Sequence, residues 1–430
     1  MQAVVFRNAK LIDLDREAPE ITSIRIEGER ITAIGPDAEQ AVDARVIDLG
    51  GRSVMAGMFS CHFHASYSPA AMMTGMPGGM DSPAVYQAYV AAQNAATALN
   101  CGITSAVGAG TPHAIDTSLK RAIDEGLVPG PRLMAGSRDV STTGHASEKF
   151  FPWYWETENP AALSCDGADA IRGGVRGEIK RGAEIVKVFA TAGHGVPGMV
   201  DKVDLTQEEM NAAADAAHQR GAKIRAHIAN RAGILSALEA GFDVIDHGDG
   251  LDEDCIAKMV DAGTFFCPSM RYPYGYVSKF QDVLADSMRE GFEGMKHMLP
   301  IANQAGVKIV LGDDYGSPGL PHGSYGEELE FYVNVAGIPA RDVLRWATVN
   351  GAELMDRAHE LGAIRQGYLA DLIVLDGDPL SDIGIFSDHD RILAVMKGGA
   401  FVKDGLAGLR QDRKPESFAR ANLELGAVSQ

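Results

Sequence analysis

The feature that most constrains this chain is a regular alternation, through its middle, of short apolar runs with longer amphipathic stretches. The eight apolar runs are SVMAGMFSCHFH, ITSAVGAG, PRLMAGSRDV, EIVKVFATAG, KIRAHIA, DVIDHGDG, TFFCPS and KIVLGDD. Strands that alternate with helices run parallel through right-handed crossovers, which predicts an α/β fold and most simply a closed (β/α)8 barrel of the TIM type. An open doubly wound sheet is the alternative, but no glycine-rich phosphate fingerprint follows the first strand.

The stretch before KIRAHIA shows the helical pattern in detail. Thr206 and Glu209 predict a capping box at its start, and Gly221 is expected to end it. Its apolar residues fall on one helical face: Met210, Ala213, Ala214 and Ala217.

Both ends of the chain differ from this middle part. They contain short alternating runs with tight turns, such as the hairpin signal EGER with Gly28 at the turn, and DLIVLDGDP near the other end. We therefore predict a small composite β-sandwich from residues 1–55 and 365–410. The barrel is expected over residues 56–364, and residues 411–430 are predicted to be a polar tail.

The overall composition excludes some function classes. Lysine and arginine number 39 against 58 aspartates and glutamates, for a net charge of −19, which disfavours nucleic acid and anionic membranes as partners. The five scattered cysteines include no CxxC pair, and no apolar stretch approaches 18 residues. We expect a cytoplasmic homo-oligomer without disulfides that acts on a small molecule.

Unusual polar residues fall at the ends of the predicted strands, where (β/α)8 barrels carry their chemistry. They are His62 and His64, Lys187, His227, His247, and the pair Asp313 and Asp314. Each alone has an ordinary structural explanation, but their joint occurrence at five strand ends is typical of a divalent metal site. Residues i and i+2 of a strand project to the same side, so His62 and His64 are able to bind one ion together.

Several segments resemble the amidohydrolase superfamily, and the resemblance covers nearly the whole chain. VMAGMFSCHFHAS resembles the family's first-strand motif, with Ala56 where a proline is usual. A subgroup that includes imidazolonepropionase-like proteins and Xaa-Pro and Xaa-Arg dipeptidases is similar to four further segments: ALNCGITSAVGAG, IKRGAEIVKVFATAG, ALEAGFDVIDHG and GAIRQGYLADLIVLDGDPL. The resemblance implies a (β/α)8 barrel with a composite β-sandwich.

The resemblance also implies a role for each residue of a two-metal site. His62, His64 and Asp314 would hold one ion, His227 and His247 the second, and Lys187, carboxylated by CO2, would bridge them. The ions are expected to be zinc, with manganese, nickel or cobalt as alternatives. Asp314 fits the family's Gly-x-Asp pattern better than Asp313, and it would move protons between the attacking water and the leaving nitrogen.

Further residues are candidates for catalysis or substrate contact. His145 aligns with a family segment that carries a histidine near the substrate and is a second catalytic candidate. His322 falls in a pattern seen in the subgroup and is a candidate for substrate contact, whereas His194 does not fit that pattern; neither is expected to be a metal ligand. Tyr154 and Trp155 belong to an aromatic loop, SEKFFPWYWETENP, that would form a hydrophobic lid, a dimer contact or a packed loop.

The expected reaction is hydrolysis of an amide bond in an N-acyl or aromatic substrate. Dipeptidase relatives usually have Ala and then His or Tyr after the fifth-strand histidine, whereas His227 is followed here by Ile228 and Ala229. One alternative is a dipeptidase or carboxypeptidase of the Xaa-Pro or Xaa-Arg type. Another is a deaminase or cyclic-amide hydrolase, although many of these use one metal and lack the bridging lysine. A non-catalytic scaffold is the remote alternative, because such proteins commonly lose metal ligands, whereas this chain keeps all six candidate ligands.

Overall fold

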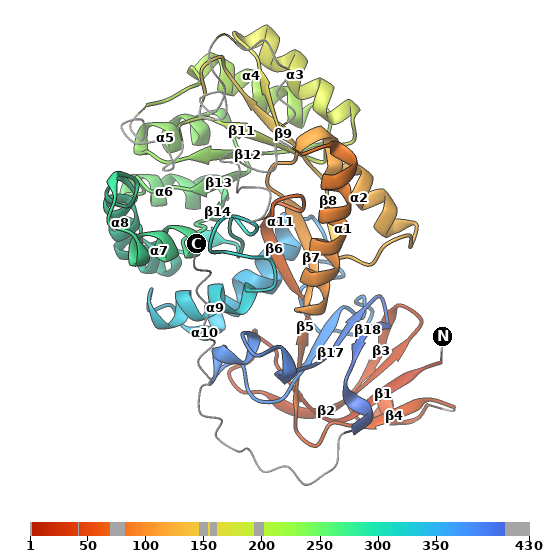
Figure 1. Ribbon diagram of the computed structural model, residues 1–430. Coiled ribbons are helices and arrows are strands. Elements are labelled where there is room, and N and C mark those ends of the chain that lie inside the picture. The colour runs from red at the N-terminus through yellow and green to blue at the C-terminus, as the bar shows by residue number, and fades with distance from the viewer. Residues whose placement is uncertain are drawn as a thin grey trace, which may run out of the picture.

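The computed structural model describes residues 2–41, 43–68, 82–145, 154, 161–192 and 202–408. Two parallel sheets lie in the middle of the chain, with helices on their outer side, and a separate sheet lies at one end (Figure 1). This α/β arrangement agrees with the fold class predicted from the alternating runs.

The strands of the two parallel sheets follow the order of the predicted apolar runs. The three-stranded sheet contains β6 (Met58–Phe63), β7 (Ile103–Gly108) and β8 (Arg132–Met134). The seven-stranded sheet has the order β10-β9-β11-β12-β13-β14-β15. Its strands are β9 (Gly136–Ser141), β10 (Ala162–Ser164), β11 (Ile185–Phe189), β12 (Lys223–Ile228), β13 (Val244–His247), β14 (Phe265–Cys267) and β15 (Lys308–Ile309). Each of the eight predicted runs contains at least one of these strands.

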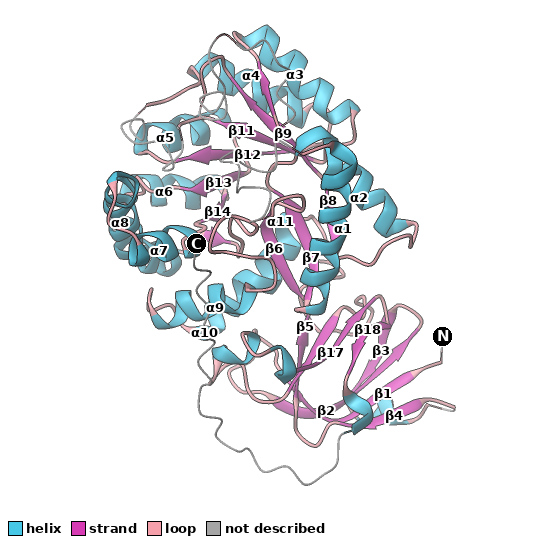
Figure 2. Cartoon of the chain, in the orientation of Figure 1, coloured by secondary structure: helices cyan, strands magenta, loops and turns pink. Residues whose placement is uncertain are grey.

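Helices follow most of these strands and cover their outer faces (Figure 2). They are α1 (Ala84–Asn100), α2 (Ile115–Asp124), α3 (Ala168–Lys180), α4 (Gln207–His218), α5 (Arg231–Ala240), α6 (Glu253–Ala262), α7 (Arg271–Lys279), α8 (Val283–Ala305), α9 (Tyr325–Asn334), α10 (Ala340–Arg345) and α11 (Gly351–Leu354). The predicted capping box of Thr206 and Glu209 is confirmed at the start of α4, and the four predicted face residues are buried. The helix ends at His218, three residues before Gly221, whose φ of +71° belongs to the turn that follows.

The two parallel sheets are connected at both edges of the three-stranded sheet. β8 runs directly into β9 with only Ala135 between them. At the other edge, the backbone N–H of Cys61 in β6 donates to the carbonyl of Leu311, just after β15, at 2.6 Å. Among the described strands no continuous ladder joins β15 to β6, so closure of the barrel is not directly observed.

A third sheet combines strands from the two ends of the chain, which Figure 1 shows as red and blue strands side by side. Its strands are β1 (Val4–Leu11), β2 (Glu20–Glu27), β3 (Arg30–Ile34), β4 (Arg45–Asp48), β5 (Ser53–Ala56), β16 (Leu372–Leu375), β17 (Ile392–Lys397) and β18 (Ala400–Asp404). The antiparallel pairing of β5 with β16 joins the two segments, and Gly28 occupies the predicted hairpin turn with a φ of +59°. The sandwich form and the domain boundaries stay predictions.

The five cysteines are all buried and free, as their spacing indicated. Within the described ranges, no helix is both long enough and apolar enough to cross a membrane. The cytoplasmic location stays a prediction, and the expected tail at 411–430 lies outside the described residues.

Candidate metal centre

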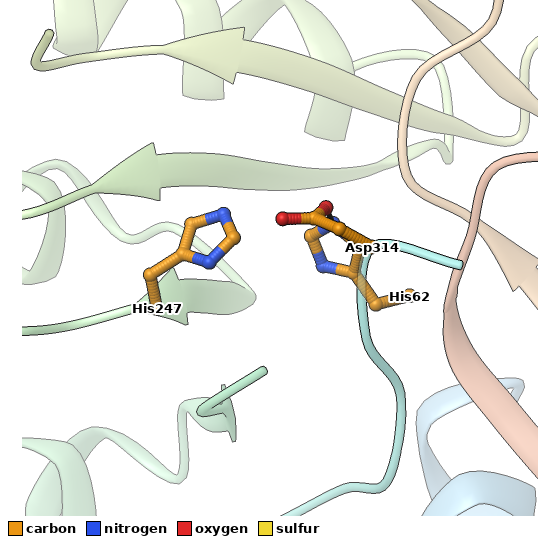
Figure 3. A group of neighbouring side chains, drawn as sticks. All are labelled: His62, His247 and Asp314. Atoms are coloured by element: carbon orange, nitrogen blue, oxygen red, sulfur yellow. Dashed lines mark ion pairs between the residues drawn. The ribbon is translucent and has the colours of Figure 1, made fainter. Parts of the chain in front are cut away.

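Two histidines from the end of β6 meet one carboxylate. The Nε2 atoms of His62 and His64 lie 3.2 Å apart, as expected for residues on one side of a strand. Oδ1 of Asp314 lies 3.0 Å from Nε2 of His62 and 3.3 Å from Nε2 of His64. Figure 3 shows this carboxylate beside the His62 ring, with one of its oxygens towards His247.

The surroundings of His64 fix which of its nitrogens carries the proton. Nδ1 lies 2.9 Å from the carbonyl oxygen of Gly110, which only accepts, so Nδ1–H donates and Nε2 keeps its lone pair. Burial lowers the pKa of His64 to about 4, so the imidazole is neutral near pH 7. Neutral imidazole is the form that binds metals.

The converging atoms fit a divalent ion. Ligands held tetrahedrally at about 2.1 Å from one ion are about 3.4 Å apart, close to the separations among His62, His64 and Asp314. Ligand atoms of His62, His247 and Asp314 also lie within 4.8 Å of one another. Imidazole nitrogen with carboxylate oxygen is a donor set that zinc and neighbouring transition metals prefer.

Strand periodicity brings His227 to the same place. In β12, Ile224, Ala226 and Ile228 pack into the main hydrophobic core, which leaves Arg225 and His227 on the opposite face. The His227 ring stacks on the ring of Phe189 from β11, with 4.3 Å between centroids.

His247 reaches the site by departing from strand periodicity. Its neighbour Ile245 packs in the main core, and simple alternation would direct His247 to the same side. Its φ of +68° is rare for a residue other than glycine and marks local strain of the kind found at functional sites. The His247 ring centroid lies 4.3 Å from that of His227 and 5.2 Å from that of His62.

Lys187 lies on the inner face of β11 and is only 2% exposed. Its outward-facing neighbours Val186 and Val188 belong to the main core. Its Nζ donates to Oδ2 of Asp246 in β13 at 2.7 Å, and the remaining oxygen of Asp246 lies 3.2 Å from Nδ1 of His62. The lysine therefore points into the cluster rather than outward.

The two consecutive aspartates at the end of the eighth run have different contacts. Oδ2 of Asp313 accepts the backbone N–H of Arg271 at 2.6 Å, at the start of α7, and Oδ1 accepts the N–H of Asp314 at 2.7 Å. Asp314 instead faces the Nε2 atoms of His62 and His64. A Cβ at Gly312 would lie 2.3 Å from the backbone nitrogen of His62, so this close approach requires glycine.

Three of the other predicted site residues, His145, Tyr154 and His322, are among the described residues. His145 is buried in the turn after β9, and Tyr154 is 65% exposed. His322 lies behind the ligands: its Nδ1 is 2.7 Å from the hydroxyl of Tyr325 and its Nε2 is 3.2 Å from the carbonyl oxygen of His64. Trp155 and His194 lie outside the described residues.

Sequence reasoning missed three buried charged residues at the site: Arg225, Asp139 and Asp246. Asp139 stands opposite Lys187 in the ladder between β9 and β11, and burial raises its pKa to about 7. Arg225 lies two residues before His227 and Asp246 directly before His247. The signal available in the sequence was a charged residue inside each of three apolar strand runs.

Comparison with known proteins identifies the family. The model of the amidohydrolase family matches residues 53–402, most of the chain and every strand of the two parallel sheets. The chain belongs to the amidohydrolase family. This amidohydrolase is a hydrolase of carbon–nitrogen bonds, and its family generally binds divalent metals, in agreement with the expectations from sequence.

Relatives of this amidohydrolase have several activities. An ochratoxinase from Aspergillus niger is 28% identical over 385 residues, covering 81% of this chain and 75% of that protein. A prolidase solved in complex with N-methylphosphonate-L-proline is 28% identical, with a TM-score of 0.84, and covers 94% of this chain and 100% of that one. A 5'-deoxyadenosine deaminase from Methanosarcina mazei is 24% identical over 414 residues, 87% of this chain and 85% of that protein. The structural relatives indicate a TIM-barrel fold for this amidohydrolase.

Proposed function

We propose that this chain hydrolyses the amide bond of an N-acyl amino acid with an aromatic or apolar group, releasing a carboxylate and an amine. The observation that carries the proposal is the convergence of His62, His64 and Asp314 on one point, within reach of His247. A buried group of lone-pair atoms of this kind is costly unless an ion or protons satisfy it.

We assign His62, His64 and Asp314 to one ion, with His227 and His247 at a second and Lys187 between them. Zinc is the proposed metal. When bound, divalent ions lower the pKa of water towards neutrality and polarise a carbonyl oxygen. The amine of Lys187 would add to CO2 by forming an N–C bond and releasing one proton to solvent, which makes the side chain an anionic ligand.

Asp314 is the proposed general base and acid. Its carboxylate borders both histidines of the first ion and is 19% exposed, so it is the member of the cluster that is open to solvent and substrate. It would accept a proton from water as the carbonyl carbon is attacked, and then give that proton to the departing nitrogen.

Aromatic side chains border the cluster and favour an apolar substrate. Tyr67 stacks on His64 with 4.0 Å between ring centroids, and Phe189 stacks on His227. The backbone N–H of Tyr272 lies 3.4 Å from Asp313, and burial raises the pKa of the Tyr272 hydroxyl. The similarity to ochratoxinase supports the same substrate class, and ochratoxin is therefore a candidate substrate.

A second candidate is a dipeptidase of the Xaa-Pro type, favoured by the similarity to the prolidase complex. Asn230, the first polar residue after His227, does not replace the substrate contact that dipeptidases make in this segment. The side chain of Asn230 accepts the N–H of Gly233 at 2.8 Å and caps α5, so it is engaged in holding the helix.

A substrate panel tests the choice. We expect the zinc-loaded enzyme to hydrolyse N-benzoyl-L-phenylalanine and ochratoxin A with kcat/KM at least about 10-fold above that for leucyl-proline, a difference of about 1.4 kcal/mol in activation free energy. The variant Asp314→Asn, assayed on the same panel, controls for contaminating hydrolases. Faster turnover of leucyl-proline would favour the dipeptidase, and deamination of 5'-deoxyadenosine would favour the deaminase.

We also infer that the two parallel sheets close into one (β/α)8 barrel and that the terminal segments form a sandwich beside it. The run from β8 into β9 and the Cys61–Leu311 hydrogen bond support closure, because they lie at opposite edges of the three-stranded sheet. The separate hydrophobic core of the terminal sheet, built around Phe6, Ile24 and Leu372, supports a second folding unit.

A further inference from the structure

Arg225 is a fully buried arginine directly below the histidine cluster. It lies on the inner face of β12, two residues before His227, and its exposed fraction is 0%. Its Nη1 donates to the carbonyl oxygens of Cys61 at 2.7 Å and Gly108 at 3.0 Å, so it connects β12 with β6 and β7. Burying a guanidinium costs free energy unless its N–H groups have hydrogen-bond acceptors, and these two carbonyl oxygens are acceptors of that kind.

The other side of the guanidinium holds Asp246. Nε of Arg225 donates to Oδ2 of Asp246 at 2.9 Å, and Nη2 donates to Oδ1 of the same carboxylate. Nζ of Lys187 also donates to Oδ2 of Asp246 at 2.7 Å, so three N–H donor groups from two basic side chains converge on this one buried carboxylate.

Asp246 in turn faces His62. Its Oδ1 lies 3.2 Å from Nδ1 of His62, and Nη2 of Arg225 is also 3.2 Å from that nitrogen. When Nδ1 carries the proton it donates to Asp246, and Nε2 then presents its lone pair to Asp314 and His64. Asp246 only accepts at this position, so it favours the tautomer of His62 that keeps the Nε2 lone pair available, and Arg225 holds Asp246 in that place.

Building on the proposed function, we propose that Arg225 is a positioning residue of the metal centre. It holds the Asp246 carboxylate against His62, and it neutralises that carboxylate without Lys187, which is then free to turn towards the ions. Carboxylates that orient a metal-binding histidine typically change metal affinity by about 10–100-fold when they are lost. Arg225 acts one step further out, through Asp246.

The chain offers a matched control in the pair of Arg132 and Asp371. This arginine also makes two bonds to one buried carboxylate, Nε to Oδ2 at 2.7 Å and Nη2 to Oδ1 at 3.0 Å. The pair connects β8 to the terminal sheet, where Asp371 also accepts the N–H of Gly398 at 2.6 Å. Replacing Arg132 removes the same kind of ion pair at a place remote from the histidines.

The experiment compares the wild type with Arg225→Met, Arg225→Lys and Arg132→Met. For each protein, zinc affinity is measured by titration at fixed pH, and thermal unfolding is measured in the presence of a chelator. Loading with cobalt(II) adds a visible spectrum that reports the ligand geometry. We expect Arg225→Met to bind zinc about 10–100-fold more weakly with an altered cobalt spectrum, and Arg225→Lys to retain more affinity. Arg132→Met should lose thermal stability but keep the wild-type zinc affinity and spectrum.

The outcomes separate this inference from the proposed function. If the wild type binds zinc and Arg225→Met binds it equally well with the same cobalt spectrum, Arg225 is only structural and the inference is wrong. Should Arg225→Met fail to fold, Arg225→Lys decides, because it keeps the charge but loses the paired geometry. Wild-type affinity in Arg225→Lys would then overturn the inference. A wild type that binds no zinc would overturn the proposed function as well.

Discussion

Replacing Asp314 with asparagine is expected to lower kcat by about 10³-fold, or about 4 kcal/mol in activation free energy. Asparagine has nearly the same size and keeps one oxygen beside His62 and His64, but it cannot accept and return a proton. The variant should remain folded, because Asp314 is partly exposed and forms no helix cap. Steady-state kinetics on the best substrate of the panel measure the effect.

The neighbouring residue provides the control for this prediction. Asp313→Asn removes a carboxylate whose oxygens accept the N–H groups of Arg271 and Asp314. We expect it to lower the free energy of unfolding by about 1–3 kcal/mol while kcat stays within about 10-fold of the wild type. Equal losses of kcat in the two variants would contradict the assignment of proton transfer to Asp314.

Loss of Lys187 is expected to have the second large effect. Lys187→Ala removes the one inward-facing amine of β11 and leaves space near Asp246. We expect the zinc content to fall from about two ions per chain to one or fewer, and kcat/KM to fall by about 100-fold or more. Elemental analysis of the purified variant and steady-state kinetics give the two values.

Small carboxylates distinguish a ligand role of Lys187 from a structural one. Acetate or propionate is small enough to enter the space that Lys187→Ala leaves and to supply the missing anion. Partial recovery of activity is expected with these ions, but not with chloride. In Lys187→Met the side chain fills the space, so the same carboxylates should have no effect. Full activity and two zinc ions in Lys187→Ala would contradict the proposal.

Much of the fold was predictable from local patterns. The eight apolar runs each contain a strand, and the capping box of Thr206 and Glu209 marks the start of α4. These features depend on residues close together in the chain, so the sequence displays them directly. The length of β15 was not predictable in this way, because the run KIVLGDD continues to Asp314 whereas the strand ends at Ile309. Beyond it the chain approaches His62 closely at Gly312, which depends on a partner 250 residues away.

The histidines of the site were easier to predict than the buried residues that hold them in place. His62 and His64 are recognisable from their spacing, because period two alone places them on one side. The place of His247 depends on a backbone φ of +68° that no alternation rule gives. Arg225 and Asp246 are separated by 21 residues, and each has an ordinary explanation when taken alone. Only the register of β12 against β13 brings their side chains together.

The central claim is that side chains from five strand ends hold two divalent ions side by side. Anomalous X-ray diffraction from crystals of the zinc-loaded protein tests it most directly, because it locates the ions independently of activity. The account predicts two adjacent peaks, one bordered by His62, His64 and Asp314 and the other by His227 and His247, with Lys187 between them. No zinc peak among these residues, or an ion there with Lys187 still paired to Asp246, would contradict it.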